Sequence, residues 1–426
     1  MKTIGGARPR TIRAIASGSL TNGAPVIVNT DGTVKVITGA AGSTGSETVF
    51  ASASMLDIAT VYDPDSSKIV IAYRQGDDSF GIVGTVSGTS ISFGSATSFH
   101  SGTSPADELS MCYSTGSDKV VIAYSDQTAG DIGKCVVGTV SGTSISFGSA
   151  VTFESGGNVS ETALSYDPDQ DKVLLAYYPN YGATKFPKAL VGTISGTSIS
   201  FGSNLTVGLE DDVGINVVHD PSIDKHIIVS KNYATVATIS GTSVSIGSIV
   251  QYASSVGNDE GRPAGIAFDS ANNKTVIFYR DTGASNVLTA IVCSVSGTTI
   301  SYGTPVALAG SYFYNQGPDS ASYNANAGKF VVAYKDDSNQ GYWATGAVSG
   351  TSFVWDGQNT FNGSDNSAFQ STVYDTSAAK TVLLFSDNGN SQYGTALVIG
   401  LSFTDLTSEN YIGIAGEAVS DGAEVT

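Results

Sequence analysis

Tyr62-Asp63-Pro64-Asp65-Ser66-Ser67-Lys68 is the stretch that decides the fold, because its ring-to-lysine spacing returns seven times along the chain. In each copy an aromatic ring or a His lies six residues before a Lys, and an apolar run usually follows. The pairs are Tyr62/Lys68, Tyr113/Lys119, Tyr166/Lys172, His219/Lys225, Phe268/Lys274, Tyr323/Lys329 and Tyr374/Lys380. A fixed period of about 50 residues is typical of a repeat architecture.

A second signature, Ser-Gly-Thr after an apolar strand, occurs in six of the seven repeats. Its copies begin at Ser87, Ser141, Ser195, Ser240, Ser296 and Ser349. Five of them continue as an alternating strand that ends in Gly, such as Ile91-Ser92-Phe93-Gly94. The copy at Ser349 continues instead as Phe353-Val354-Trp355, and the seventh repeat has no copy near Ile399-Gly400-Leu401.

Each repeat is therefore expected to hold four short antiparallel strands. In the first repeat these are Ile58–Tyr62, Lys68–Tyr73, Gly81–Val86 and Thr89–Phe93, and the Ser-Gly turn makes a tight hairpin between the last two. Four strands in about 50 residues are the pattern of a propeller blade. The sequence predicts an all-β fold, a seven-bladed β-propeller of four-stranded antiparallel blades.

The ends of the chain must close such a ring. Because the seventh repeat lacks a fourth strand, we expect residues 33–38, which contain Val34-Lys35-Val36, to complete the last blade and remove exposed sheet edges. The propeller is then expected to span residues 33–400. Residues 1–32 are expected to form an N-terminal β arm or anchor, and residues 401–426 a C-terminal β extension.

Composition limits the partners. The net charge of −18 argues against nucleic acid and anionic membranes as partners. There is no apolar run long enough for a transmembrane helix and no signal-peptide core at the start, so synthesis in a cytoplasm is expected. The three cysteines, Cys112, Cys135 and Cys293, show no metal or disulfide spacing and are expected to be buried.

The two propeller faces are expected to differ. The turns after the first and third strands are short and repetitive, and we interpret them as structural. The loops on the opposite face are longer and rich in acids, and such variable loops usually carry binding. An acidic rim can hold Ca²⁺, but no EF-hand or RTX spacing supports this, so solvated acids and no cofactor are expected.

Aromatic residues gather around the sixth repeat on the acidic face. Rings beside carboxylates suit a sugar-binding surface, where rings stack on the sugar and oxygens bind its hydroxyls. The alternative is that the rings pack a blade edge or a partner subunit. The candidate glycan-binding residues are Tyr312, Tyr314, Tyr342, Trp343, Asp319, Asp336 and Asp337.

No catalytic centre is expected. The three histidines, His100, His219 and His226, show no metal-binding spacing. Sialidase-like propellers hold a carboxylate with an Arg cluster. The predicted ring has only Arg74, Arg262 and Arg280, and the Asp-box pattern of that family is absent.

The flanks resemble segments of tailed-bacteriophage virion proteins. The opening Ser19-Leu20-Thr21-Asn22-Gly23-Ala24-Pro25-Val26-Ile27-Val28-Asn29-Thr30-Asp31-Gly32-Thr33-Val34 is similar to their N-terminal segments. The ending Glu409-Asn410-Tyr411-Ile412-Gly413-Ile414-Ala415-Gly416-Glu417-Ala418-Val419-Ser420-Asp421-Gly422 is similar to segments of tail-fibre and appendage proteins. The Ser-Gly-Thr repeats are also similar to those of viral structural proteins. The resemblance implies a place in a virion and carries no binding residues with it.

The leading hypothesis is a non-enzymatic virion structural protein, a tail-fibre or other host-facing component that binds a surface glycan or a neighbouring virion protein. It would be present as a homo-oligomer or in many copies. One alternative is a capsid or tail decoration protein that stabilises the particle. The other is a sialidase-like glycan hydrolase.

Overall fold

The computed structural model describes residues 14–16, 25–28, 33–36, 43–179, 186–209, 214–257, 265–313, 320–401, 411–414 and 424–425. The chain divides into two compact units, residues 43–400 and the two ends together, 1–42 with 401–426. In the unit of the two ends, β1 (Ala14–Ile15) pairs with β37 (Glu424–Val425), and β2 (Pro25–Val28) lies between β3 (Val34–Val36) and β36 (Tyr411–Ile414). The N- and C-terminal segments thus share their sheets.

Residues 43–400 are all β apart from three single 3-10 turns among the described residues: η1 (Gln127–Ala129), η2 (Thr282–Ala284) and η3 (Asn388–Asn390). Four repeats form separate antiparallel sheets of four successive strands plus one short fifth strand. The second has β10 (Ala106–Ser114), β11 (Lys119–Asp126), β12 (Ile132–Ser141), β13 (Ser144–Phe147) and β14 (Val151–Glu154). The third has β15 (Val159–Asp167), β16 (Lys172–Pro179), β17 (Lys188–Ser195), β18 (Ser198–Phe201) and β19 (Leu205–Thr206).

The fourth repeat has β20 (Asn216–Asp220), β21 (Lys225–Ser230), β22 (Tyr233–Ser240), β23 (Ser243–Ile246) and β24 (Val250–Gln251). The fifth has β25 (Gly265–Asp269), β26 (Lys274–Asp281), β27 (Val287–Ser296), β28 (Thr299–Tyr302) and β29 (Val306–Ala307).

The remaining three repeats are joined into one twelve-stranded sheet, because two long strands each run from one repeat into the next. The sixth repeat has β30 (Ala321–Asn324), β31 (Lys329–Lys335), β32 (Gln340–Ser349) and the start of β33 (Ser352–Asp375). The seventh has the end of β33, β34 (Lys380–Asp387), β35 (Tyr393–Gly400), β4 (Ser43–Thr44) and the start of β5 (Thr48–Asp63). The first has the rest of β5, then β6 (Lys68–Gln75), β7 (Asp78–Ser87), β8 (Ser90–Phe93) and β9 (Thr97–His100).

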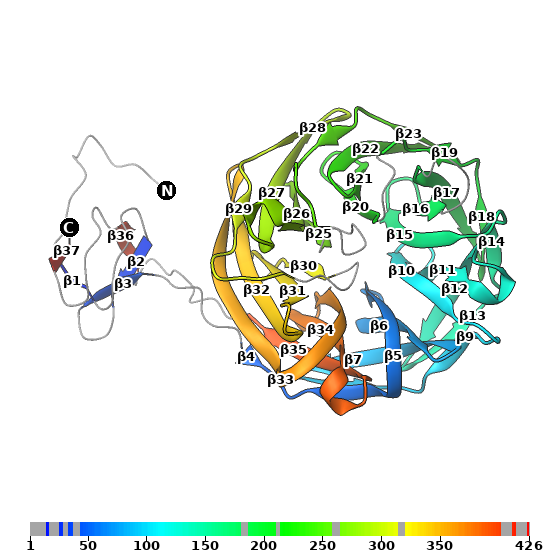
Figure 1. Cartoon of the computed structure of the whole chain (residues 1–426), viewed down its shortest axis with the longest axis horizontal. Coiled ribbons are helices and arrows are strands. Elements are labelled where there is room, and N and C mark those ends of the chain that lie inside the picture. The colour runs from blue at the N-terminus through cyan, green and yellow to red at the C-terminus, as the bar shows by residue number, and fades with distance from the viewer. Residues whose placement is uncertain are drawn as a thin grey trace. The chain divides into compact units, whose positions relative to one another are not determined.

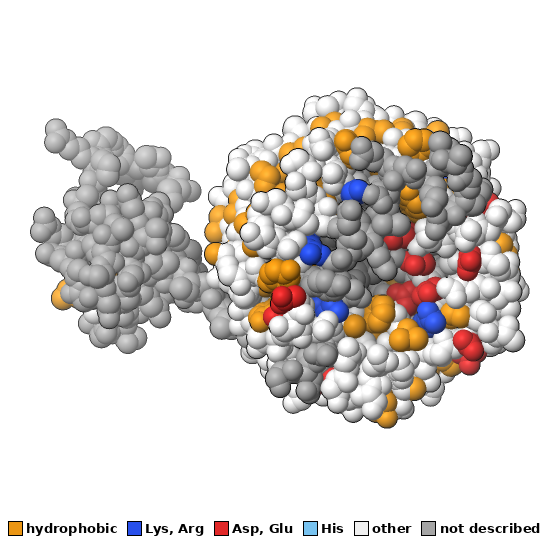
Figure 2. Space-filling view, viewed as in Figure 1, with side chains coloured by type: hydrophobic (Ala, Val, Ile, Leu, Met, Phe, Trp, Pro, Cys, Tyr) orange, Lys and Arg blue, Asp and Glu red, His pale blue; other side chains and the backbone are white. Residues whose placement is uncertain are grey.

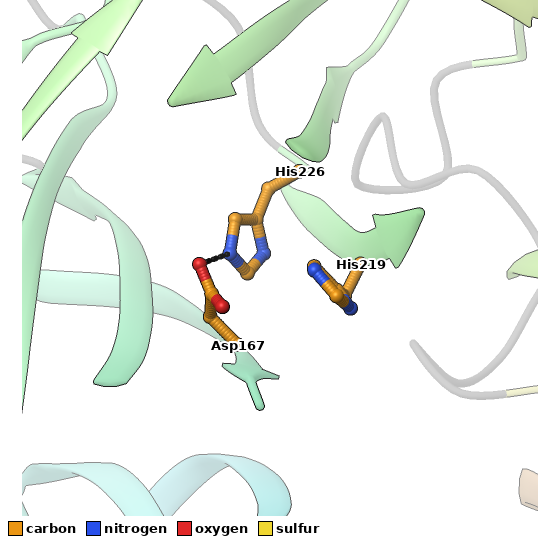
Figure 3. A group of neighbouring side chains, drawn as sticks. All are labelled: Asp167, His219 and His226. Carbon is orange, nitrogen blue, oxygen red and sulfur yellow. Dashed lines mark ion pairs between the residues drawn. The ribbon is translucent and has the colours of Figure 1, made fainter. Parts of the chain in front are cut away.

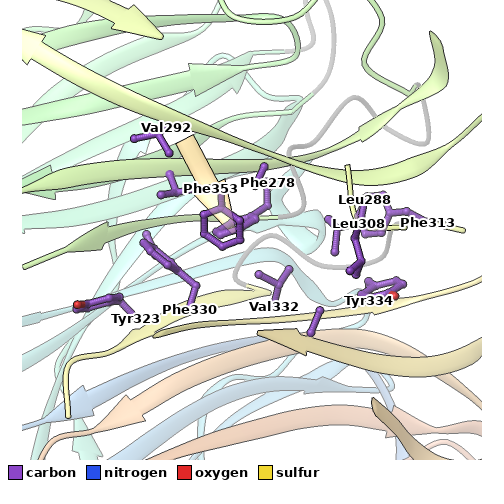
Figure 4. Close-up of a cluster of buried hydrophobic side chains, with 14 residues drawn as sticks. Phe278, Leu288, Val292, Leu308, Phe313, Tyr323, Phe330, Val332, Tyr334 and Phe353 are labelled. Carbon is purple, nitrogen blue, oxygen red and sulfur yellow. The ribbon is translucent and has the colours of Figure 1, made fainter. Parts of the chain in front are cut away.

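The sheets stand around a common centre, each facing its neighbours (Figure 1). Apolar cores lie between successive sheets rather than inside one of them, so both faces of the central strands are buried. Figure 4 shows the core between the fifth and sixth repeats, where Phe278 meets Phe330 and Phe353 at ring-centroid distances of 5.5 Å. All three cysteines are buried, as expected.

The expected turn chemistry is present in all seven ring-to-lysine hairpins. The residue after the ring accepts one or more backbone N–H groups of the turn, and these capping residues are all nearly or fully buried: Asp63, Ser114, Asp167, Asp220, Asp269, Asn324 and Asp375. Lys119 and Lys172 donate to turn carbonyls, which gives those carbonyls a hydrogen-bond partner. Lys329 pairs instead with the carboxylate of Asp356.

The glycine that ends the fourth strand has a packing role at the next repeat. A Cβ on Gly148 would overlap the carbonyl oxygen of Thr197, the Thr of the following Ser-Gly-Thr turn. The same contact occurs for Gly45/Thr89, Gly94/Thr143, Gly202/Thr242, Gly247/Thr298 and Gly303/Thr351. This close approach divides the outer strand into two pieces, such as β8 and β9, and explains why each repeat shows a short fifth strand.

The expectation that residues 33–38 complete the last repeat is wrong. Val34–Val36 is β3, which pairs with β2. The strands that pair with β35 are β4 and the start of β5, where Thr44 lies opposite Ile399 and Ser43 opposite Gly400. The reason is the glycine contact just described, because Gly45 donates to Val398 as Gly94 donates to Val83, so Ser43-Thr44-Gly45 is the missing strand end.

Candidate functional site

The candidate binding region lies on the side of the molecule that carries the long loops, around the sixth repeat. A row of rings joins the loop after β29 to β31 and β32. Phe313 packs against Tyr334 at a centroid distance of 5.7 Å, and Tyr334 stacks on Tyr342 at 5.4 Å and 19°. The structure therefore brings together the two aromatic segments that sequence reasoning placed on one surface.

Two of the expected tyrosines offer ring surface there. Tyr312 is 37 % exposed, and its hydroxyl accepts a hydrogen bond from the side-chain amide of Asn286 at 3.3 Å. Tyr342 is half-buried and donates to Asp336 at 3.3 Å. Burial, with the neighbouring Asp336 carboxylate, raises the pKa of Tyr342 above its ordinary value, so its hydroxyl remains a donor at neutral pH.

The carboxylates beside these rings have different roles. Asp336 accepts the backbone N–H groups of Ser338 and Gln340 at 2.9 Å each, which fixes the loop. Asp337 is exposed. Lys335, whose side chain is nearly buried, donates to Asn339 at 2.7 Å, and burial lowers its pKa. The loop thus holds one carboxylate in place for its own structure and presents the other to solvent.

Trp343 does not belong to this surface. It is only 1 % exposed and lies on β32, where the strand register places it opposite Ala333. Other repeats carry a small residue at this position, such as Gly81, whose Cβ would meet the ring of Phe147 in the next repeat. Tyr314 and Asp319 lie outside the described residues.

Among the described residues, several acids of the loop side have structural roles. Asp126, Asp281 and Asp387 cap η1, η2 and η3 by accepting backbone N–H groups of the turn. Nearer the first strands, Asp57 accepts the N–H of Leu109 at 2.9 Å, from the neighbouring repeat. Figure 2 shows acidic side chains near the middle of the face in view.

The arginines are occupied by neighbouring loops. Arg74 forms a 2.9 Å ion pair with Asp107, and Arg280 donates to Asn286 at 3.0 Å. Arg262 lies outside the described residues.

A groove of about 420 Å³ runs along the outer strands of the fifth and sixth repeats, next to Val306, Val354 and Trp355. Its lining is mainly apolar, and its one carboxylate, Asp356, is paired with Lys329 at 2.7 Å.

Two of the three histidines come together although their spacing had suggested no site. His219 and His226 face each other across the hairpin of β20 and β21, and Asp167 of the preceding repeat joins them. The ring-to-lysine spacing contained the signal, because the residue after the Lys lies opposite the ring in every hairpin, as Ile69 lies opposite Tyr62.

No protein-family model matches the sequence, and no curated protein matches it significantly. Among solved structures, the chain is similar to the β-propeller domain of Cps50 (Swd1) from Myceliophteria thermophila, with a TM-score of 0.52, 8% identity, and coverage of 85% of this chain and 100% of that one. The fold is a β-propeller.

Two further structures show lower similarity. A protein from Lactobacillus plantarum has a TM-score of 0.46 at 10% identity over 82% of this chain and 99% of that one. A mutant of AofleA from Arthrobotrys oligospora has 0.47 at 10% over 78% and 92%. Within the described part of the propeller and the terminal unit, no helix has the length and apolar character needed to cross a membrane.

Proposed function

We propose that residues 43–400 form a closed propeller of seven blades, one for each repeat. In support, the first strand of each repeat contacts that of the next, and β33 in turn contacts β5. The hydroxyl of Tyr62 also donates to Ser377 of the last hairpin at 2.8 Å. The closing strand pieces are then β4 and the start of β5, which pair with β35.

Two truncations test this closure. A chain that begins at Ser43 should keep the thermal stability of the propeller, because every strand that pairs with β35 is retained. A chain that begins at Met55 should lose much of it, because one side of β35 becomes an unpaired edge. Equal stability of the two chains would rule out closure by residues 43–54.

We further propose that this propeller is a non-catalytic binding module of a bacteriophage virion, a tail-fibre or other host-facing component that binds a surface glycan. The observation that carries the proposal is the exposed ring of Tyr312, whose neighbour Phe313 packs on Tyr334. Tyr334 stacks on the half-buried Tyr342, which donates to Asp336, and Asp337 beside it is exposed. Aromatic faces stack on the apolar face of sugar rings, and carboxylates accept their hydroxyl groups. The resemblance of the flanks to phage appendage segments supports the virion setting.

A glycan array of bacterial surface polysaccharides tests the proposal. We expect binding that falls at least tenfold in Tyr312→Ala and in Asp337→Asn, because each removes a contact from the same surface. Ile249→Ala is the control, since Ile249 is similarly exposed, at 39%, but lies in another repeat. If the wild-type chain binds no polysaccharide, a decoration protein that stabilises the particle becomes the better assignment, and its position in a virion reconstruction would show this.

A further inference from the structure

The side of the propeller opposite the long loops carries one junction unlike the other six. Turn caps of one repeat contact the ring-to-lysine hairpin of the following repeat, at the ring or at the residue after the Lys. Asn324, for example, donates to Thr381 at 3.4 Å. Between the third and fourth repeats these positions hold Asp167, His219 and His226, and this is the one junction with an imidazole at either position.

These three side chains are close together, and Asp167 and His226 are buried. One ligand atom from each lies within 4.8 Å of the others (Figure 3). The carboxylate oxygen of Asp167 is 3.6 Å from Nε2 of His226, and the exposed fractions of the two side chains are 2% and 0%. Nε2 of His219 is 3.7 Å from a carboxylate oxygen of Asp224, at the edge of the same hairpin. Three nitrogen and oxygen atoms, one each from Asp167, His219 and His226, therefore converge on one place, and Asp224 lies beside His219.

The fold of the described residues gives no hydrogen-bond partner to the Nε2 atom of either histidine. Among the described residues, no hydrogen-bond partner contacts Nε2 of His219, Nε2 of His226 or the near oxygen of Asp224, although all three atoms are buried. Buried polar atoms normally have partners, because leaving one unpaired costs about 1–3 kcal/mol. The separations of 3.6 and 3.7 Å are too long for good hydrogen bonds.

These distances are near those between two ligands of one metal ion. With bonds of about 2.0–2.2 Å, two ligands of a tetrahedral ion lie roughly 3.4 Å apart. The widest separation in the group, up to 4.8 Å, requires the imidazole of His219 to move inward by about 1 Å. His219 is the least buried of the three, with 10% of its side chain exposed.

The surroundings of His226 also suit a ligand. Its Nδ1 lies 2.6 Å from the hydroxyl of Ser165. If Nδ1–H donates to that oxygen, Nε2 carries the lone pair that points toward Asp167, and such outer partners are typical of metal-bound histidines.

We propose that Asp167, His219 and His226 form a binding site for a divalent transition metal, with Zn²⁺ as the best match. Two imidazoles with a carboxylate oxygen are a ligand set for Zn²⁺ rather than for Ca²⁺, which prefers oxygen alone. The ion would link the third repeat to the fourth, since Asp167 belongs to one sheet and the two histidines to the next. Its role would be structural.

The full chain, stripped with a chelator and titrated with Zn²⁺, tests the site. We expect about one Zn²⁺ bound per chain and a rise of roughly 2–4 °C in the thermal midpoint at saturating metal. Co²⁺ in place of Zn²⁺ should give the intense visible absorption of a tetrahedral complex.

The chain itself supplies a matched variant. At the next junction the equivalent residues are Asp220, Phe268 and Thr275, so the double substitution His219→Phe, His226→Thr copies a junction that already folds here. It should bind Zn²⁺ at least 100-fold more weakly. Ser165→Ala should weaken binding about 10–100-fold, whereas His100→Gln, which changes the one histidine outside the group, should leave it unaltered.

Zn²⁺ binding that survives the double substitution would overturn the proposal, as would the absence of stoichiometric binding by the wild-type chain at micromolar concentration. If the double variant does not fold, side-chain nitrogen NMR of the wild-type chain decides the question. The proposal requires the resonances of two histidines to shift with Zn²⁺ while the third stays unchanged; any other pattern refutes it.

Discussion

Two junctions between neighbouring repeats differ in which repeat supplies the large side chain. They are the junction of the first and second repeats and that of the sixth and seventh. In the first, Gly81 leaves space that the ring of Phe147 from the next repeat fills. In the second, Trp343 stands at the position of Gly81, and Thr44 at the position of Phe147. The large side chain thus comes from the later repeat at the first junction and from the earlier repeat at the second. Residue size at these positions is therefore set by the pair across the junction rather than by the repeat alone.

The glycine contact follows the same logic. Six junctions pack a glycine against the carbonyl of the following Ser-Gly-Thr turn. The seventh repeat has no such turn, since β35 ends at Gly400 and β4 begins at Ser43. At the junction before it, Asp356 occupies the position of the glycine and pairs with Lys329. Where the carbonyl is missing, the glycine is missing too.

The largest effect is expected for Trp343→Ala. Loss of a side chain that is 1 % exposed should lower the free energy of unfolding by about 3–5 kcal/mol. Tyr312→Ala should change it by no more than about 0.5 kcal/mol, because that ring is on the surface. Urea denaturation of both variants checks this, and similar midpoints for the two would contradict the burial of Trp343.

Gly148→Val should destabilise the propeller by about 3 kcal/mol, because the new side chain must displace the Thr197 turn. Two controls separate this contact from backbone strain. Gly142→Ala has a φ of 63° with open space around it and should cost about 1 kcal/mol. Asp356→Gly should also cost about 1 kcal/mol or less, because it removes one partly exposed ion pair. A Gly148→Val variant as stable as the controls would show that the close approach is not needed.

The smallest effect concerns the turn caps. Asp269 is fully buried and accepts the N–H groups of Ala271 and Asn272. Asp269→Ala should lower the free energy of unfolding by about 1–2 kcal/mol, because those donors lose their acceptor. Asp269→Asn should be milder, since Asn324 performs the same function in the sixth repeat. Thermal denaturation would measure both, and the explanation fails if Asn is as disruptive as Ala.

The repeated hairpins, the four-strand pattern and the turns after the first and third strands could be predicted, because they depend on local spacing. The closing strand could not be found in the same way. Its signature is Thr44-Gly45-Ser46, in which Thr44 takes the place of the usual aromatic residue. The residue paired with it is also different, because the larger Ile399 stands where the first repeat has Gly84. A search for a segment similar to the fourth strands of the other repeats selects Val34–Val36, which belongs to the other unit.

The candidate site was predictable only in part. The spacing put the segment of Tyr312 and that of Tyr342 on one side of the repeat, and the structure links the two segments through Phe313 and Tyr334. The spacing could not tell an exposed ring from a buried one. Trp343 is buried although Gly81 holds the equivalent position in the first repeat, and its burial depends on how neighbouring sheets pack. His226 meets Asp167 for the same reason, through the packing of two sheets.

The pairing of Ser43 with Gly400 makes the propeller an insertion within another fold. The chain enters and leaves residues 43–400 at neighbouring strands, while the segments before and after them share the sheets of a second unit. Such an arrangement lets the repeat array be removed, exchanged or expanded without changing the order of the host segments.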